Sequence, residues 1–192
     1  MSKKIIQLKR LFDIFFSLTA LIILIVPLII IYIAVFLTSY TPIIYWSDRV
    51  GKNNKIFKMP KFRSMRNLTP LVPKEKLNYH TKWLTPLGAF LRKTSLDELP
   101  QIWCVLKGDM SLIGPRPALH NQYDLIELRN KYKIYKIRPG ITGWAQVNGR
   151  DTISLKQKVL FDDYYLRKYT FWLDIKIIWL TIIKVLTFDG FK

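Results

Sequence analysis

Cysteine and histidine are almost absent from this chain of 192 residues. Its one cysteine, Cys104, excludes an intrachain disulfide, and its two histidines, His80 and His120, are far apart in the sequence. These counts argue against a disulfide-stabilised fold and against a zinc site made of cysteine and histidine. We therefore expect any bound metal to have oxygen ligands.

Acidic residues are also scarce, with 13 Asp and Glu against 31 Lys and Arg, and the net charge is +18. This charge favours anionic partners such as nucleic acid, phosphorylated small molecules or an acidic membrane surface. The sequence contains no nucleic-acid-binding motif, so we expect no nucleic acid partner. Gly51-Lys52 lacks the second glycine and the Lys-Ser/Thr pair of a P-loop. The length suits a single domain.

Charged residues are missing altogether from Ile14 to Leu37. At about 1.5 Å per residue, a helix over this stretch exceeds the roughly 30 Å hydrocarbon core of a bilayer. Lysine and arginine flank it on both sides, which places both flanks in the cytoplasm. Pro27 is expected to kink the helix so that it enters the membrane and returns to the same face. A tilted spanning helix fits these features equally. We predict the re-entrant form over residues 1–40, without secretory cleavage.

The remaining residues, 41–192, are expected to form one catalytic or binding domain at the cytoplasmic face. Apolar and polar residues alternate from 45 to 65 around Gly51-Lys-Asn-Asn54, which predicts a β-hairpin. We expect a loop over 67–83, with a short helix near 73–79, and another short helix over 86–93.

Two adjacent carboxylates, Asp97 and Glu98, lie in the segment Ser95-Leu-Asp-Glu-Leu-Pro-Gln101. The apolar spacing from 96 to 106 predicts a short helix that begins at this segment. Ser95 and Glu98 have the spacing of a capping box. Acids in a first turn ordinarily complement the helix dipole, so this segment by itself favours a structural role.

Cationic side chains at two places suit phosphate binding. Lys61, Arg63 and Arg66 form a local cluster that fits either a phosphate or lipid headgroups. Arg116 lies between two prolines, which stiffen its loop, and a guanidinium can bind two phosphate oxygens at once. An ion pair between Arg116 and a nearby acid such as Asp109 is the structural alternative.

Two later segments are expected at the site and at the membrane. Three glycines and a proline surround Trp144 between 138 and 150, which predicts a compact loop that lines a site. An apolar segment over 171–187 has Trp172 and Trp179 as candidate interfacial anchors, and it suits a helix on the membrane surface. A buried core helix is the alternative.

Four motifs together resemble the bacterial sugar transferases, a family of monotopic polyprenyl-phosphate phosphoglycosyl transferases. The motifs are Lys61-Phe-Arg-Ser-Met65, Ser95-Leu-Asp-Glu-Leu-Pro-Gln101, Gly108-Asp-Met-Ser-Leu-Ile-Gly-Pro-Arg-Pro117 and Pro139-Gly-Ile-Thr-Gly-Trp-Ala-Gln-Val147. The resemblance covers nearly the whole chain and looks closest to small members, such as the transferase that begins N-glycan assembly in Campylobacter. It implies an α+β, mostly helical fold, with a re-entrant membrane helix, a β-hairpin and interfacial helices.

The resemblance also implies a reaction. A sugar 1-phosphate passes from a UDP-sugar, with N-acetylated amino sugars among the candidates, to undecaprenyl phosphate, and UMP is released with Mg²⁺ assistance. Asp97 matches the nucleophile that forms a phosphosugar intermediate, and we expect it to contact the metal. Glu98 matches its dyad partner and Arg116 a phosphate-binding residue, to which we add Lys61 and Arg63. The helix start is expected to keep Asp97 ionised.

One position departs from the family pattern, because many members carry Ser-Pro at the membrane kink where this chain has Val26-Pro27. Asp162 aligns with an acid near the family's C-terminal site, and the sequence gives it no role. The implied location is the cytoplasmic face of the bacterial inner membrane, in contact with membrane lipids, and exposed aromatic residues permit a homodimer. The competing hypotheses are a membrane-anchored binder of nucleic acid or anionic lipid, and a family member that serves capsule or O-antigen.

Overall fold

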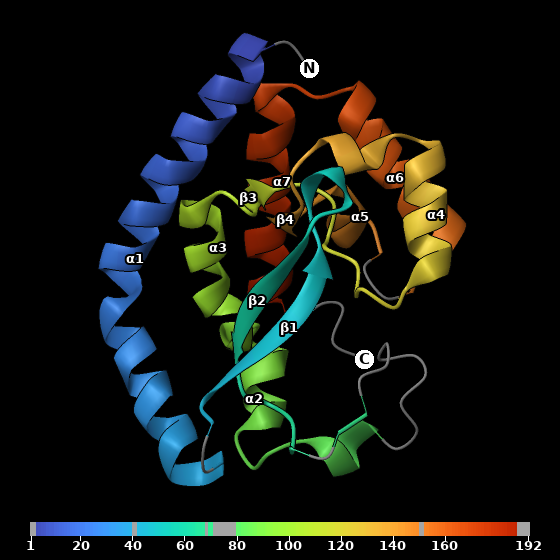
Figure 1. Cartoon of the computed structure of the whole chain (residues 1–192). Helices are drawn as coiled ribbons and strands as arrows, with labels where there is room; N and C mark the ends of the chain where they lie inside the picture. Colours follow the sequence, from blue (N-terminus) through green and yellow to red (C-terminus); the bar gives the residue numbers. More distant parts are fainter. Residues whose placement is uncertain (1–2, 40–41, 68, 71–79, 150–151, 188–192) are drawn as a thin grey trace.

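A single long helix, α1 (Lys3–Ser39), contains the apolar segment and runs along one side of the molecule (Figure 1). The computed structural model describes residues 3–39, 42–67, 69–70, 80–149 and 152–187. Only 11% of the most apolar stretch of α1 is buried, and the length and composition of the helix are sufficient for it to cross a membrane. The helix continues through Pro27 and is bowed, so the predicted kink takes the form of a curve.

The inner side of α1 is attached to the domain near both of its ends. Near the start, the Asp13 carboxylate accepts hydrogen bonds from the Ser111 hydroxyl and the Leu112 amide, both at 3.0 Å. Near the other end, Ile31 and Val35 belong to an apolar cluster with residues of the domain, namely Ile43, Phe62 and Leu91. The same domain therefore holds both halves of α1.

The predicted hairpin is confirmed. Strands β1 (Ile44–Val50) and β2 (Ile56–Phe62) pair antiparallel in a register that sets Ile44 opposite Phe62 and Val50 opposite Ile56. The short 3₁₀ turn η1 (Lys52–Asn54) joins them, and Asn53 and Asn54 have positive φ there, which asparagine tolerates well.

Two short helical segments follow the hairpin, η3 (His80–Trp83) and α2 (Gly88–Lys93). The second confirms the helix expected over 86–93, whereas the helix expected near 73–79 lies outside the described residues. Gly88 packs directly on the end of the hairpin, because a Cβ there would lie 2.0 Å from the Ser64 carbonyl oxygen.

The helix expected over 96–106 is divided into a 3₁₀ segment, η4 (Leu96–Gln101), and an α-helix, α3 (Ile102–Lys107). The capping-box prediction is wrong, since Ser95 adopts a left-handed conformation with φ of 58° and its side chain makes no cap hydrogen bond. Glu98 instead turns toward cations of other segments. Pro100 has no N–H to donate, which disfavours a regular α-helix at this point.

A second, parallel pair of short strands lies at the centre of the domain. Strand β3 (Ser111–Ile113) pairs with β4 (Gly140–Thr142), with Ser111 opposite Gly140. The approach requires glycine, because a Cβ on Gly140 would lie 2.1 Å from the Gly114 nitrogen. The segment predicted as a loop over 138–150 thus contains β4 and a short helix, α5 (Trp144–Val147).

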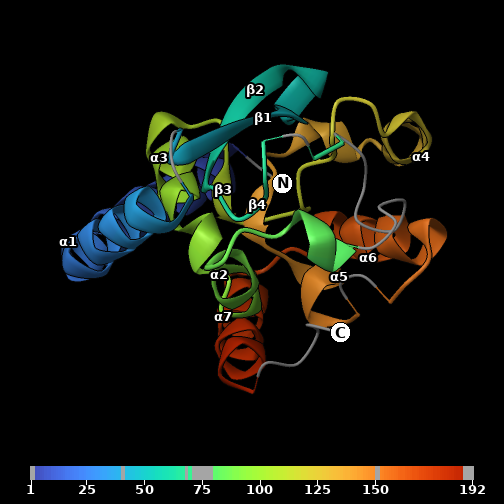
Figure 2. The same ribbon diagram turned by 90° about the horizontal axis from the view of Figure 1, so that it is seen from below.

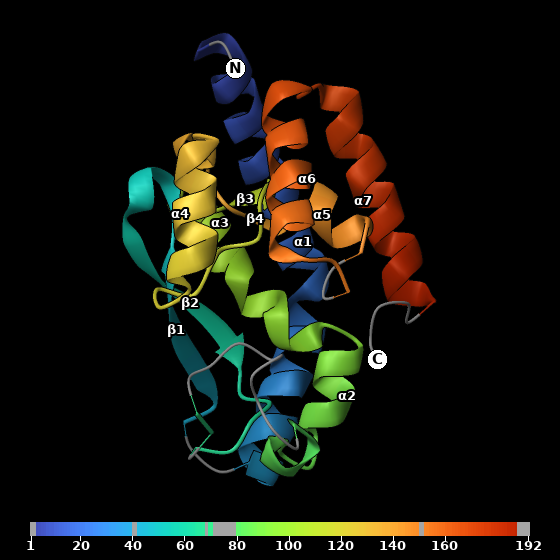
Figure 3. The same ribbon diagram turned by 90° about the vertical axis from the view of Figure 1, so that its right-hand side faces the viewer.

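Three longer helices and one 3₁₀ turn complete the domain: α4 (Tyr123–Lys131), η5 (Ile134–Lys136), α6 (Leu155–Arg167) and α7 (Phe171–Leu186). Helices α4 and α6 lie side by side, and the hairpin and α7 lie on opposite sides of the body (Figures 2 and 3). The helix predicted over 171–187 is confirmed. Ile177 is buried in a core cluster with Ile113 and Tyr165, whereas Trp172 and Trp179 are exposed.

Candidate functional site

The hairpin and η4 bring Lys61 and Glu98 together although they are far apart in sequence. The Lys61 ammonium donates to Glu98 Oε1 at 2.6 Å. Arg116 approaches the same carboxylate with both guanidinium nitrogens, Nη1 to Oε2 at 3.2 Å and Nη2 to Oε1 at 2.5 Å. The acid partner of Arg116 is therefore Glu98, and Asp109 pairs with Lys107. Three of the predicted site residues thus meet at one carboxylate.

A third cation, Arg49, adjoins this cluster and was missed by the sequence reasoning. Its guanidinium donates to the Ser47 hydroxyl at 3.0 Å and to the Pro117 carbonyl at 3.3 Å. Burial, together with the neighbouring charge of Arg116, lowers the pKa of Arg49 to about 10. The pairing of the two strands could have identified Arg49. Tyr45 lies opposite Lys61 and therefore on the same face of the hairpin. Because side chains alternate along a strand, Arg49, four residues after Tyr45, shares that face.

The two adjacent acids have opposite electrostatic settings. Burial raises the pKa of Asp97, and the nearby charge of Glu98 adds to this, while Lys61 opposes it. Burial would also raise the pKa of Glu98, but Arg116 and Lys61 hold it well below its usual range. Asp97 is buried in a 3₁₀ segment, and the charges of Lys61, Arg92 and Arg116 favour its ionised form. That the helix start keeps Asp97 ionised stays a prediction.

Asp97 is nevertheless well placed beside these cations. Its carboxylate lies 3.5 Å from the Ser64 hydroxyl at the end of β2, and the charges of Lys61, Arg92 and Arg116 all lower its pKa. Among the residues that the structure describes, no cation forms an ion pair with Asp97, whereas two bind Glu98, and this leaves the Asp97 carboxylate available for chemistry.

Arg63, another predicted phosphate-binding residue, lies apart from the cluster around Glu98. The Arg63 guanidinium donates to the Pro42 carbonyl at 2.6 Å and lies over the Tyr45 ring at 5.8 Å. Arg66 similarly donates to the Leu84 carbonyl. A phosphate-binding role for Arg63 stays a prediction.

A buried ion pair supports the Arg116 loop from behind. Arg129 on α4 donates twice to Oδ2 of Asp162 on α6, at 3.0 and 2.6 Å, and its remaining nitrogen donates to the Arg116 carbonyl at 2.8 Å. Asp162, to which the sequence assigned no role, therefore orients Arg129, and Arg129 fixes the backbone of Arg116.

The residues present fit a magnesium ion held mainly by substrate. The described part of the chain contains no group of three or more His, Cys, Asp or Glu residues that would form a complete metal site. Mg²⁺ commonly binds through one or two carboxylates together with phosphate oxygens of a substrate. Asp97 offers one such carboxylate, while Glu98 is already engaged by Lys61 and Arg116.

The site is a pair of adjacent acids among cations, with Asp97 buried, and the same fold has a long apolar helix whose length and composition fit a membrane-associated protein. The chain belongs to the bacterial sugar transferase family, whose sequence model matches residues 3–188. It is 39% identical to an uncharacterised sugar transferase, EpsL, of Bacillus subtilis, over 96% of this chain and 90% of that protein.

Two longer relatives have named reactions. The chain is 40% identical to the UDP-glucose:undecaprenyl-phosphate glucose-1-phosphate transferase of Escherichia coli, over 92% of this chain and 40% of that protein. It is also 40% identical to the undecaprenyl-phosphate galactose phosphotransferase of Salmonella typhimurium, over 95% of this chain and 41% of that protein. The chain therefore spans about two fifths of these two relatives.

Proposed function

We propose that this protein transfers a sugar 1-phosphate from a UDP-sugar to undecaprenyl phosphate and releases UMP. The observation that carries the proposal is the position of Asp97, a buried carboxylate next to a Glu98 that is neutralised by Lys61 and Arg116. An anionic nucleophile attacks a diphosphate only where cations offset the charge of both. Arg49, Lys61 and Arg116 supply this positive charge in a largely buried setting.

The proposed reaction uses this arrangement in two steps. An Asp97 oxygen attacks the phosphorus that carries the sugar, the bond from that phosphorus to the bridging oxygen breaks, and UMP leaves with the electron pair. The resulting aspartyl phosphosugar is then attacked by a phosphate oxygen of undecaprenyl phosphate, which restores the Asp97 carboxylate. Two steps suit two substrates of opposite solubility, because UMP leaves before the lipid phosphate enters.

Mg²⁺, if bound through Asp97 and the diphosphate, would supply Lewis-acid charge at the transferred phosphoryl group. The protein groups have separate tasks. Arg116 and Lys61 keep Glu98 ionised and in place. Arg116 also binds the substrate phosphate, from a loop whose backbone is fixed by Arg129. Arg49 adds charge next to Arg116 from the hairpin.

A re-entrant path for α1 at the cytoplasmic face of the inner membrane is part of the same proposal. The contacts near both ends of α1 with one domain support it, since a straight spanning helix would carry one half away from that domain. The bow of α1, the helix that contains Pro27, supports it as well. Labelling a tag placed before Ser2 from outside intact cells checks this, and an accessible tag would contradict the re-entrant path.

The sugar is the least determined part of the reaction. The names of the two longer relatives point to hexoses such as glucose or galactose, whereas N-acetylated amino sugars were one candidate class implied by the resemblance. A panel of UDP-sugars, scored by UMP release with undecaprenyl phosphate and Mg²⁺, decides between these classes.

The test of the mechanism is the variant Asp97→Asn with the best sugar of that panel. With a UDP-sugar that carries a radiolabel in its sugar, we expect no UMP release and no labelled protein after acid quenching. The reason is that an amide cannot act as the nucleophile. The surface variant Asp48→Asn, which removes an exposed pair with Lys58, should keep wild-type activity. UMP release by Asp97→Asn at the wild-type rate would exclude the aspartyl intermediate. Salt-sensitive DNA binding without UMP release would instead favour an anion-binding protein that is not an enzyme.

A further inference from the structure

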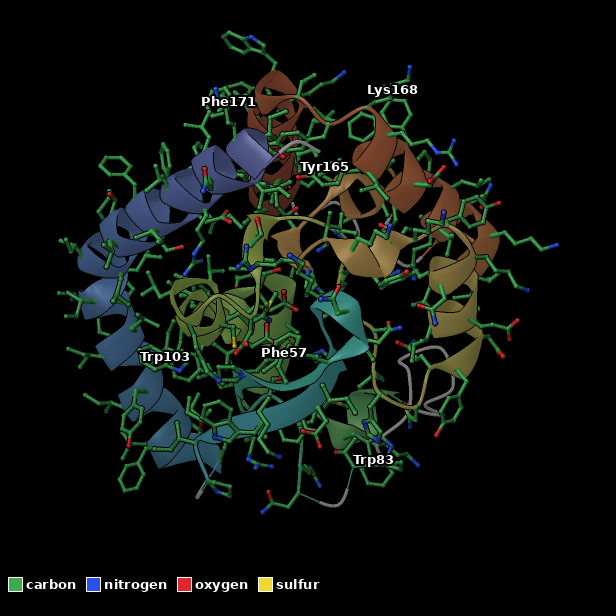
Figure 4. The ribbon with its side chains drawn as sticks, turned by 45° about the horizontal axis from the view of Figure 1, so that its top comes forward. Phe57, Trp83, Trp103, Tyr165, Lys168 and Phe171 are labelled. Carbon is green, nitrogen blue, oxygen red and sulfur yellow. The ribbon has the colours of Figure 1, made fainter. Side chains whose placement is uncertain are left out.

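Cationic side chains also gather in a second place, a hollow beside the N-terminal part of α1. Five of them line it: Lys9, Arg10, Lys52, Lys136 and Arg138. They come from α1, from the hairpin turn η1, and from η5 and the residues that follow it. None of the residues placed in the Asp97 site belongs to this lining. Figure 4 shows Tyr165, which also lines the hollow, close to the first turns of α1.

The acids near this hollow are already committed to other partners. Asp13, which lines it, accepts hydrogen bonds from the Ser111 hydroxyl and the Leu112 amide. Asp174 binds the Lys9 ammonium at 2.7 Å. The hollow therefore keeps a marked excess of positive charge, and an anion is the ligand that this charge favours.

The two arginines are held rigidly by uncharged groups. Arg10 donates to the carbonyls of Val105 and Leu106, the latter at 2.7 Å, and Arg138 donates to the Gly108 carbonyl at 2.7 Å. These bonds complement the C-terminal end of α3 and explain why the two guanidinium groups lie close together. They do not explain the lysines.

Lys52 and Lys136 make no ion pair with any residue that the structure describes, although both line the hollow. Each is a flexible ammonium at the end of a four-carbon chain, which suits a ligand that approaches from outside. They are thus the side chains left to contact an incoming anion.

The apolar part of the lining indicates which kind of anion. Ile6 and Ile113 line the hollow together with the cations. Ile6 is also exposed on α1, just before the apolar stretch that we assign to the membrane. Phe171, labelled in Figure 4, contacts Phe12 of α1 with ring centroids 5.4 Å apart. Trp172, the next residue, is 78% exposed. Exposed aromatic side chains of this kind gather at membrane interfaces.

We propose that this hollow binds the phosphate headgroup of an anionic membrane lipid. Lys52 and Lys136 contact the phosphate, and Arg10 and Arg138 provide fixed positive charge behind it. Because the lining joins α1, the hairpin turn and η5, a bound headgroup ties three segments of the fold together at the membrane surface. The site lies outside the transfer reaction and does not depend on the proposed function.

The experiment uses the full chain in neutral detergent micelles and measures the midpoint of thermal unfolding. At about ten times its dissociation constant, phosphatidylglycerol should raise this midpoint by roughly 3–6 °C, because it binds the folded state alone. Phosphatidylcholine should give no shift. The double variant Lys52→Gln/Lys136→Gln should lose most of the shift, whereas the matched exposed pair Lys156→Gln/Lys168→Gln should keep it.

Two results would overturn the lipid assignment. An equal shift in wild type and in Lys52→Gln/Lys136→Gln would exclude this hollow as the binding site. An equal shift with inorganic phosphate at the same concentration would assign the hollow to a free phosphate. Without lipid, the double variant should unfold at the wild-type midpoint. If it is unstable, the single variant Lys136→Gln replaces it and should lose about half of the shift.

Discussion

Two arginine–carboxylate pairs lie one behind the other at the Arg116 loop, and they differ in burial. In the outer pair, Arg116 with Glu98, the arginine side chain is 32% exposed; in the inner pair, Arg129 with Asp162, it is 10% exposed. The inner pair reaches the outer one through the bond from Arg129 to the Arg116 carbonyl. The outer pair is open enough to meet a substrate, whereas the inner pair keeps the loop in position.

The largest effect on activity in this comparison is expected from Glu98→Gln. Without this charge, Lys61 and Arg116 lose the carboxylate that they share, and the geometry of the cations around Asp97 is lost. We expect UMP release to fall about 10²–10³-fold, in the range of losing one preorganised electrostatic contact. Steady-state kinetics measures this. The control is Glu127→Gln, which removes an exposed pair with Lys131 and should change little. Unchanged kinetics in Glu98→Gln would mean that the outer pair is only structural.

The inner pair should affect stability more than chemistry. Asp162→Asn leaves the buried Arg129 without its carboxylate, and we expect the free energy of unfolding to fall by about 3 kcal/mol. Activity measured well below the melting temperature should fall only about tenfold. The loss is limited because Arg129 can still donate to the Arg116 carbonyl. The neighbouring variant Asp163→Asn breaks a surface pair with Arg167 and should cost less than about 1 kcal/mol. Equal losses of stability in the two variants would contradict the structural role of the buried inner pair.

The third prediction concerns pH. The positive charge of Lys61 lowers the pKa of Asp97, against burial, which raises it. Removing that charge in Lys61→Met therefore raises the pKa of Asp97 further. Because only the ionised carboxylate is a nucleophile, activity is lost as pH falls through this pKa, and the acidic limb of the pH–rate profile should move to higher pH. The control Lys58→Met removes an exposed lysine of the same strand and should leave the limb in place. An unmoved limb in Lys61→Met would show that the limb does not report Asp97.

Local pattern predicted the elements better than their ends. The hairpin, the helix after Pro86 and the C-terminal helix were all predicted, because each depends on alternation or apolar spacing within a few residues. The capping box at Ser95 failed, although the same device does occur at Ser154 and Gln157 on α6. The difference is tertiary: Glu98 has Lys61 and Arg116 within reach, and a local cap cannot compete with two charged partners.

The sequence motifs identified the main residues of the site, whereas the residues that position them became known only from the fold. Asp97, Glu98, Lys61 and Arg116 were named from the sequence and lie together. Arg49 required the strand register, and the link from Asp162 through Arg129 to the Arg116 carbonyl required the packing of α4 on α6. Contacts of this kind join residues far apart in sequence, and no spacing rule encodes them.

The smallest effect should come from Arg63, the predicted phosphate-binding residue that lies apart from the two pairs. Its guanidinium is held by the Pro42 carbonyl and the Tyr45 ring, next to the C-terminal end of α1. In Arg63→Gln we expect UMP release to fall no more than about threefold, in line with the small contribution of one partly exposed cation. Affinity for vesicles that contain phosphatidylglycerol should fall, since one cation near the surface contributes about 1 kcal/mol to binding an anionic membrane. A loss of more than tenfold in UMP release with unchanged vesicle binding would instead establish Arg63 as a substrate phosphate ligand. That result would require Arg63 to leave Pro42 and extend the outer pair toward the membrane.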